Sequence, residues 1–162
     1  MDVFLQPGEV YFGDAETRIR TVLGSCVAVT LWHPQLRIGG MCHFMLPNRR
    51  RRPADAALNG KYADEALQLL EAELMRAGTA PVAYEAKLFG GGNMFEREVP
   101  QRSVDVSGKN VNAGRLLLEQ RGFRVCAEDL GGPGHRQIIF DIGNGAVWVR
   151  RHPLPPAPAR KR

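Results

Sequence analysis

Short apolar runs alternate with polar, glycine-rich and proline-rich segments along the chain, and their spacing predicts strands mixed with helices. Residues 21–32 and 37–45 are apolar runs that predict two β-strands. Between them, "HPQLR" contains Pro34 and predicts a turn, so a short hairpin-like connection should bring the strands together. The stretch 46–60 holds two prolines and an arginine run, which is typical of a loop.

Two segments have the spacing of helices that are apolar on one face. In residues 61–78 the apolar positions are 63, 67, 70 and 74, and Gly78 suits the C-terminal cap. A second helix is predicted at 109–121, ended by Gly122, with an inner face made of Ala113, Leu116 and Leu117.

The remaining apolar runs predict further strands. They are "AYEAKLFGG" (83–91), "FRVCAED" (123–129) and "RQIIFDIGNGAVWVRR" (136–151), and the last predicts a hairpin around Gly-Asn-Gly. The order ββ-α-β-α-βββ predicts an α+β fold, layered with mixed sheets, and differs from the regular alternation of a parallel doubly wound sheet. We expect one domain over residues 1–150 and a basic, proline-rich, disordered tail over 151–162.

The composition is that of an ordinary globular protein, with 44% hydrophobic and 24% charged residues among 162. No run approaches the roughly 18–20 apolar residues of a membrane span, and the amino terminus lacks the apolar stretch of a secretory signal. The three cysteines cannot all pair and show no CxxC spacing. A cytoplasmic protein with free thiols and no membrane insertion is therefore expected.

The net charge of +5 is concentrated in "NRRRRP" (48–53) and in the C-terminal "RRHPLPPAPARKR". Such patches attract nucleic acid, anionic lipid or an acidic protein surface, although a solvated loop and tail would look the same. No RNP-type aromatic run, helix-turn-helix pattern or zinc finger accompanies the charge. Nucleic-acid binding is therefore not expected.

Cys26 is the first candidate for chemistry, because "RTVLGSCVAV" delivers it from a Gly24-Ser25 pair to the start of an apolar run. A nucleophilic cysteine needs a base and donors for the oxyanion that forms on attack. A turn could expose the thiol and aim the backbone N–H groups of Ser25 and Cys26 at the same point. A buried structural thiol remains the alternative from this stretch alone.

A base for Cys26 must come from four histidines. His33 and His152 each precede a proline, and His135 lies in a glycine-rich loop. His43 lies inside the apolar strand "GGMCHFMLP", where a buried imidazole needs a hydrogen-bond partner. It is therefore either a satisfied core histidine or a catalytic base.

Strand geometry favours the pair Cys26–His43. Successive side chains of a strand point to opposite faces, so Cys42 and His43 should face apart. Cys26 begins the neighbouring strand, whereas Cys126 lies in a distant stretch without a nearby histidine. A catalytic Cys26 would be expected to have a depressed thiol pKa and to react selectively with alkylating agents.

No cofactor is expected. Cys26, Cys42, His43 and Cys126 could supply four zinc ligands, but adjacent strand residues diverge and no paired knuckle is present. The glycine stretch "FGGGNMF" (89–95) matches neither a Walker A loop nor a dinucleotide fingerprint.

Several blocks in order resemble the chemoreceptor glutamine deamidase (CheD) family. They are "LGSCVAV", then "GGMCHFMLP" with its histidine 17 residues after the cysteine, "GKYADEAL", "EAKLFGGGNMF", "GKNV" and "AEDLGGPGHRQIIFD". The resemblance runs from about residue 7 to 150. Individually the blocks are weakly specific, but their order and the cysteine–histidine pair make the resemblance strong.

The resemblance implies a layered α/β/β fold related to the catalytic domain of cytotoxic necrotizing factor toxins. It implies deamidation of glutamines on methyl-accepting chemotaxis receptors, and in some members hydrolysis of glutamyl methyl esters. The implied catalytic set is Cys26, His43 and a threonine, for which Thr21 is the candidate. In some members the threonine stands one residue further from the cysteine, where this chain has Arg20, so a strand bulge would be needed.

The resemblance also implies partners. Members of the family act on chemoreceptors, and several bind a CheC-type phosphatase. Arg49–Arg52 could steer the encounter with an acidic receptor surface. The alternative function is a regulatory binding partner in chemotaxis signalling with slow or no turnover.

Overall fold

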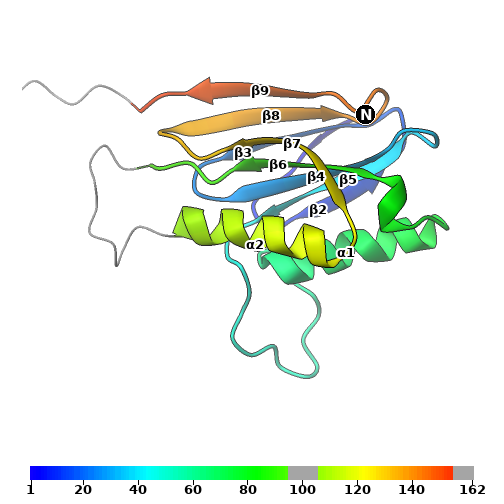
Figure 1. Ribbon diagram of the computed structural model, residues 1–162, viewed down its shortest axis with the longest axis horizontal. Helices are drawn as coiled ribbons and strands as arrows, with labels where there is room; N and C mark the ends of the chain where they lie inside the picture. The colour runs from blue at the N-terminus through cyan, green and yellow to red at the C-terminus, as the bar shows by residue number, and fades with distance from the viewer. Residues whose placement is uncertain (95–105, 155–162) are drawn as a thin grey trace, which may run out of the picture.

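The structure, a computed structural model that describes residues 1–94 and 106–154, consists of three layers. Figure 1 shows two helices on one side, a five-stranded sheet in the middle and a four-stranded sheet on the other side. The expected α+β fold with layered, mixed sheets is confirmed. Most of the predicted tail, residues 155–162, lies outside the described residues.

The central sheet has the strand order β2-β5-β4-β6-β7. Its strands are β2 (Val10–Gly13), β4 (Val27–His33), β5 (Ile38–Phe44), β6 (Glu85–Gly90) and β7 (Arg124–Leu130). The predicted hairpin is present, because β4 pairs antiparallel with β5 over their whole length. β6 and β7 pair in parallel, as expected for two strands that are connected through a helix.

The outer sheet has the order β1-β3-β8-β9. Its strands are β1 (Asp2–Phe4), β3 (Arg18–Leu23), β8 (His135–Asp141) and β9 (Val147–His152). β8 and β9 form the hairpin predicted around Gly-Asn-Gly. The described residues place no helix on the exposed side of this sheet, where Phe4 and Trp148 are about half exposed.

The prediction of one strand over 21–32 was wrong. The chain leaves β3 at Leu23, turns through Gly24–Cys26 and enters β4 at Val27, so the two halves of the run belong to different sheets. Both halves have buried apolar side chains, which makes them look continuous in sequence. Strands β1 and β2 were not predicted, because they are short and lack a fully buried face.

Helix α1 (Ala63–Arg76) agrees closely with its prediction. All four apolar positions of the expected stripe, at 63, 67, 70 and 74, are buried against the central sheet. Gly78 has a φ of 75°, the left-handed conformation that commonly ends a helix.

Helix α2 (Val106–Gln120) begins earlier than predicted and presents a different face. Its buried stripe is Asn110, Gly114 and Leu118, whereas Leu116 is 54% exposed. The predicted inner face was therefore wrong at Leu116 and only partly right at Ala113 and Leu117, which pack at the margin of the core. Because the buried stripe contains a polar residue and a glycine, the spacing of apolar residues does not reveal it.

Two apolar cores separate the three layers. One lies between the helices and the central sheet and includes Val27, Val29, Cys42 and Phe44. The other lies between the two sheets and includes Ile19, Leu23, Ala28 and Met41. Alternate residues of β4 and β5 thus enter different cores. No helix among residues 1–94 and 106–154 is long and apolar enough to span a membrane.

Candidate functional site

Cys26 lies in the turn that carries the chain from the outer sheet to the central sheet. The thiol is half-buried and packs against the apolar core between the sheets. The end of β6 packs directly against this turn. Gly90 has a φ of 111°, and a Cβ there would lie 2.2 Å from the Cys26 carbonyl oxygen. The glycines of "FGGGNMF" therefore allow a close backbone approach to the cysteine turn.

All three carbonyl groups of the turn are held. The N–H groups of Gly92 and Gly91 donate to the carbonyls of Gly24 and Cys26, both at 2.8 Å. Between them, the Asn110 side chain donates to the Ser25 carbonyl at 3.3 Å. Within the described part of the chain, the N–H groups of Ser25 and Cys26 donate no hydrogen bond. These two donors are therefore available to a ligand.

His43 and Cys26 point into the same layer, between the two sheets. In the β4–β5 register His43 lies opposite Ala28, and Cys26 precedes Ala28 by two residues on the same face. Side chains placed diagonally in this way lie about 7–8 Å apart at the backbone, within reach of an aromatic ring such as that of His43. Among the described residues, Cys26 and His43 share no hydrogen bond. Cys42 points the other way, into the core beneath the helices, so the predicted divergence of Cys42 and His43 is confirmed.

Thr21 reaches His43 across the gap between the sheets. Its Oγ1 lies 2.7 Å from His43 Nδ1, and its hydroxyl donates to the Leu5 carbonyl at 2.8 Å. Because the single hydroxyl proton is used on Leu5, the Thr21 oxygen must accept from an Nδ1–H of His43. The chain Leu5–Thr21–His43 thus fixes the tautomer that leaves Nε2 unprotonated.

No bulge is needed to bring Thr21 into place. β3 alternates regularly, with Arg20 exposed and Thr21 buried, and its register with β8 is continuous. Arg20, the residue at the alternative threonine position, points out to solvent on the other face of the outer sheet.

Burial favours the neutral form of both titratable groups of the site, the Cys26 thiol and the His43 imidazole. It lowers the pKa of His43 to about 4 and raises the pKa of the Cys26 thiol. This direction is opposite to the depressed thiol pKa that a catalytic Cys26 would be expected to have. Thr21 is uncharged and cannot stabilise an imidazolium as a carboxylate would, so no preformed thiolate–imidazolium pair is favoured here.

Two hollows among the described residues do not include the Cys26 thiol in their lining. A hollow of about 300 Å³ on the outer sheet is lined by Phe4, Trp148 and their neighbours, and one of about 400 Å³ borders the first turns of α2. Neither of these two hollows is lined by Cys26 or His43. A half-buried thiol in a surface turn is accessible to a side chain presented by another protein.

Asn110 is a site residue that sequence reasoning missed. It is fully buried, and its Nδ2 also donates to the Met45 carbonyl at 2.8 Å. It thereby links the cysteine turn to the chain just after His43. The quoted block "GKNV" contained it, but an isolated asparagine gives no signal that it is buried.

Among the described residues, the other candidates share no hydrogen bond or ring contact with Cys26, Thr21 or His43. His33 accepts a hydrogen bond from Leu36, and His135 stacks on His152 at 4.7 Å between ring centroids. Cys126 is exposed on β7. In the described ranges, no group of three or more His, Cys, Asp or Glu side chains could hold a metal ion.

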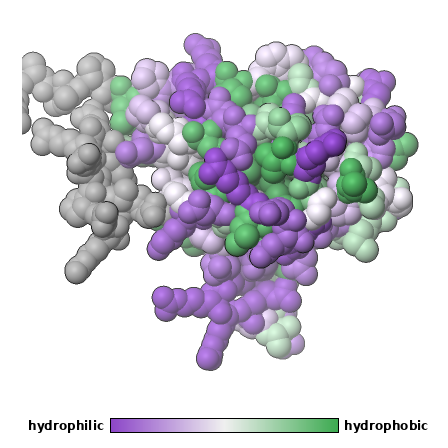
Figure 2. All heavy atoms as spheres, viewed as in Figure 1, coloured by the Kyte–Doolittle hydropathy of each residue, from purple (hydrophilic) through white to green (hydrophobic). Residues whose placement is uncertain are grey.

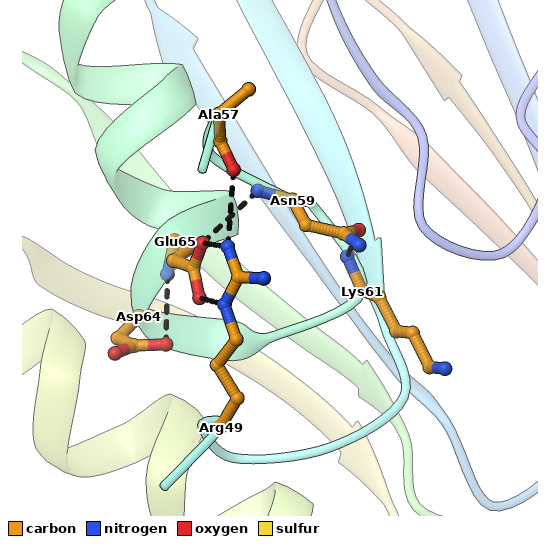
Figure 3. A network of polar contacts seen from close by, with 6 residues as sticks. All are labelled: Arg49, Ala57, Asn59, Lys61, Asp64 and Glu65. Atoms are coloured by element: carbon orange, nitrogen blue, oxygen red, sulfur yellow. Dashed lines mark hydrogen bonds and ion pairs between the residues drawn. The ribbon is translucent and has the colours of Figure 1, made fainter. Parts of the chain in front are cut away.

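The arginine run does not act as a unit. Figure 3 shows that Arg49 turns inward onto Glu65 of α1, with bonds of 2.9 and 2.6 Å to the carboxylate and 3.0 Å to the Ala57 carbonyl. Glu65 is nearly fully buried, and Arg49 holds the pKa of that carboxyl below its usual range. Arg49 thus anchors the loop between β5 and α1.

The other three arginines of the run, 50–52, are exposed. Their loop extends from the body of the molecule beneath the helices, and its surface is largely hydrophilic (Figures 1 and 2). A role in attracting an acidic surface therefore concerns 50–52 alone.

Comparison with known proteins found a matching family model and several similar proteins. The family model "CheD chemotactic sensory transduction" matches residues 45–151. A protein of Pseudomonas savastanoi pv. phaseolicola named "Probable chemoreceptor glutamine deamidase CheD" is 52% identical over 155 residues, covering 94% of this chain and 86% of that protein. A Leptospira interrogans protein, "Probable chemoreceptor glutamine deamidase CheD 1", is 42% identical and covers 93% of each chain.

A similarity to solved structures is more distant. A Bacillus licheniformis hypothetical protein, YfiH, superimposes with a TM-score of 0.48 at 14% identity. The match covers 74% of this chain and 49% of that one.

Proposed function

Because this chain belongs to the CheD family, we propose that it is a protein-glutamine deamidase that converts glutamines of methyl-accepting chemotaxis receptors to glutamate. In this proposal Cys26 is the nucleophile, His43 the general base and Thr21 the residue that orients the imidazole. The observation that carries it is the hydrogen-bonded chain Leu5–Thr21–His43, which leaves Nε2 free on the face that carries the thiol.

The first half of the reaction forms a thioester. His43 Nε2 takes the thiol proton as the Cys26 sulfur attacks the carboxamide carbon of the glutamine. The N–H groups of Ser25 and Cys26 bind the oxyanion of the tetrahedral intermediate. His43 then protonates the amine, the C–N bond breaks and ammonia leaves. An imidazolium with a lowered pKa is a stronger acid than an ordinary one, which favours this proton transfer.

The second half hydrolyses the thioester. His43 takes a proton from water, and the resulting hydroxide attacks the acyl carbon. The carbon–sulfur bond then breaks as the imidazolium returns the proton to the departing sulfur, and the new carboxylic acid ionises. The products are glutamate and the free thiol, so the cycle needs no metal and no organic cofactor. A glutamyl methyl ester would enter the same cycle with methanol as the leaving group.

Partners and location follow from the same proposal. The substrate is the cytoplasmic part of a chemoreceptor, and reducing conditions in the cytoplasm would keep the thiols free. A CheC-type phosphatase is a proposed regulator. The alternative, a regulatory binding partner with little turnover, is favoured by the raised pKa of Cys26, since most of the thiol is protonated before substrate binds.

The test is to incubate the protein, under reducing conditions, with a cytoplasmic receptor fragment from the same organism and to follow tryptic peptides by mass spectrometry. Deamidation should add about one dalton to peptides with particular glutamines, through hydrolysis of their carboxamides. The receptor fragment incubated alone is the control for spontaneous deamidation. If no glutamine is converted faster than in the control, the protein is a binding partner and the catalytic proposal is wrong.

Replacing Thr21 with valine should slow turnover by roughly 5- to 150-fold, the effect of leaving a buried donor without its acceptor. Valine keeps the shape of threonine but offers no oxygen to Nδ1–H, so the ring is no longer held with Nε2 free. Thr21→Ser keeps the oxygen and should retain most of the activity. Equal activity of the valine and serine variants in steady-state deamidation would contradict this role of Thr21.

Replacing the three exposed arginines, 50–52, with serine should raise the KM for the receptor fragment roughly 3- to 10-fold at low ionic strength. The value of kcat should not change, because the loop only attracts the substrate. The difference between variant and parent should shrink as salt is added. The single variant Arg124→Ser, at an exposed position on β7, is the control. A KM that is insensitive to the triple replacement would leave 50–52 as a solvated loop.

A further inference from the structure

Asn110 lies on the buried stripe of α2, where an apolar residue would be expected. Gly114, one turn later on this stripe, lets the helix approach the sheet, because a Cβ there would lie 2.9 Å from Leu88 Cδ2 and 3.4 Å from Phe44 Cζ. The close approach brings the Asn110 amide within reach of backbone carbonyls at the end of the sheet.

Burial of Asn110 is not explained by packing alone. Its Nδ2 is satisfied by the Met45 and Ser25 carbonyls, but its Oδ1 is buried without a hydrogen-bond partner in the described structure. A buried polar atom without a partner destabilises a fold, and such atoms are often tolerated at functional sites. The two carbonyls that Asn110 holds flank the proposed nucleophile and the proposed base in sequence.

The hydrogen bond from Asn110 to the Ser25 carbonyl also fixes the direction of the neighbouring Cys26 N–H group. A peptide group is planar and trans, so the Ser25 C=O and the Cys26 N–H belong to one rigid unit and point in opposite directions. The same holds for the Gly24 C=O, held by Gly92, and the Ser25 N–H. The donors on the carbonyl side thus decide where the two free N–H groups point.

From these contacts we infer that Asn110 is a positioning residue for acyl transfer at Cys26. It orients the Ser25–Cys26 peptide so that the Cys26 N–H binds the oxyanion. This inference rests on the proposed function, in which Cys26 attacks a carbonyl carbon. Asn110 does not touch the reacting atoms and acts through the peptide group that it holds.

The experiment compares two reactions of Cys26 that need no receptor. In the first, p-nitrophenyl acetate transfers its acetyl group to the sulfur through a tetrahedral oxyanion and releases p-nitrophenolate. In the second, iodoacetamide alkylates the sulfur by direct displacement of iodide, and no oxyanion forms. Both are measured in a Cys126→Ser background, since Cys126 is exposed, whereas Cys42 is buried and has a pKa raised to about 12.

In Asn110→Ala the acylation rate should fall roughly 10- to 100-fold while the alkylation rate changes by less than about twofold, because only the first reaction needs the oxyanion donors. Asn110→Ser, which keeps a small polar side chain that is too short to bridge both carbonyls, should behave in the same way. Asn112→Ala, at an exposed position on the same helix, should change neither rate.

Each other outcome would overturn the inference. Acylation and alkylation that fall together, or that both stay unchanged, would show that Asn110 does not act through the oxyanion. Loss of cooperative unfolding in both the alanine and serine variants would make Asn110 a structural residue. If the Cys26 thiol of the parent protein is acylated no faster than the exposed Cys126 thiol, it is the proposed function that fails.

Discussion

Replacing Cys26 with alanine should lower the rate of receptor deamidation by at least about 10⁴-fold, and replacing His43 with glutamine by about 10² to 10⁴-fold. Without the sulfur no thioester can form. Without the imidazole the thiol, whose pKa burial already raises, has no group to take its proton. The KM for the receptor should change little, since neither side chain is proposed to contribute to docking.

The double variant gives a sharper test than either single change. If the two residues act as a unit, Cys26→Ala/His43→Gln should be no slower than Cys26→Ala alone, because the base has nothing to activate once the nucleophile is gone. Hydroxylamine added during turnover should trap the acyl group as glutamyl hydroxamate in the parent protein only. A further large loss in the double variant would contradict the pairing.

Matched controls exist within the chain. Cys126→Ala removes an exposed thiol on β7, and His33→Gln removes an imidazole at the end of β4 opposite to Cys26. Both variants should retain the parent rate. Loss of activity in Cys126→Ala together with a fully active Cys26→Ala would move the nucleophile to β7 and overturn the assignment.

The proposed pair Cys26–His43 could be suggested from sequence because it depends on local geometry. Alternation along β5 separates Cys42 from His43, and a short turn at Pro34 forces β4 and β5 into one hairpin. The same local rules predicted the buried stripe of α1 and the β8–β9 hairpin. Each of these predictions needs only the spacing of the apolar positions and a turn signal, and a few consecutive residues contain both.

Contacts between the layers of the fold produce no local pattern in the sequence. The bond between Thr21 and His43 joins two different sheets, and the apolar run that contains Thr21 and Cys26 does not reveal the change of sheet between them. Asn110 and Gly114 interrupt the period of α2, because Asn110 donates to backbone carbonyls and Gly114 lets the helix approach Leu88 and Phe44 closely. Sequence therefore indicated the proposed nucleophile and base more directly than the contacts proposed to orient them.

The raised and lowered pKa values of the site have a common cause, and it also links catalysis to stability. Thr21 supplies a hydrogen bond but no charge, so burial of His43 is not compensated when the ring is protonated. In the proposed cycle, the imidazole and the thiol are therefore both neutral until a substrate carbonyl arrives. The same lack of compensation makes protonation of His43 unfavourable for the fold as a whole.

The free energy of unfolding is therefore expected to fall by up to about 3 kcal/mol between pH 6.5 and pH 4 because of His43. The folded-state pKa is about 4 and the ordinary value is 6.5, so in this window the unfolded chain binds the proton and the folded chain does not. The stabilisation is complete above pH 6.5 and is lost as the pH falls towards the folded pKa. Glu65, whose pKa is lowered by Arg49, adds to the loss only below its own ordinary value of 4.5.

Urea unfolding followed at several pH values between 7 and 4.5 measures this loss above the range in which Glu65 contributes. His43→Gln should be nearly insensitive to pH across the window, because glutamine does not titrate, whereas His135→Gln should lose stability as the parent does. If His43→Gln loses as much stability as the parent, the imidazole is not buried in the neutral form. The proposed mechanism would then have to begin with a protonated His43.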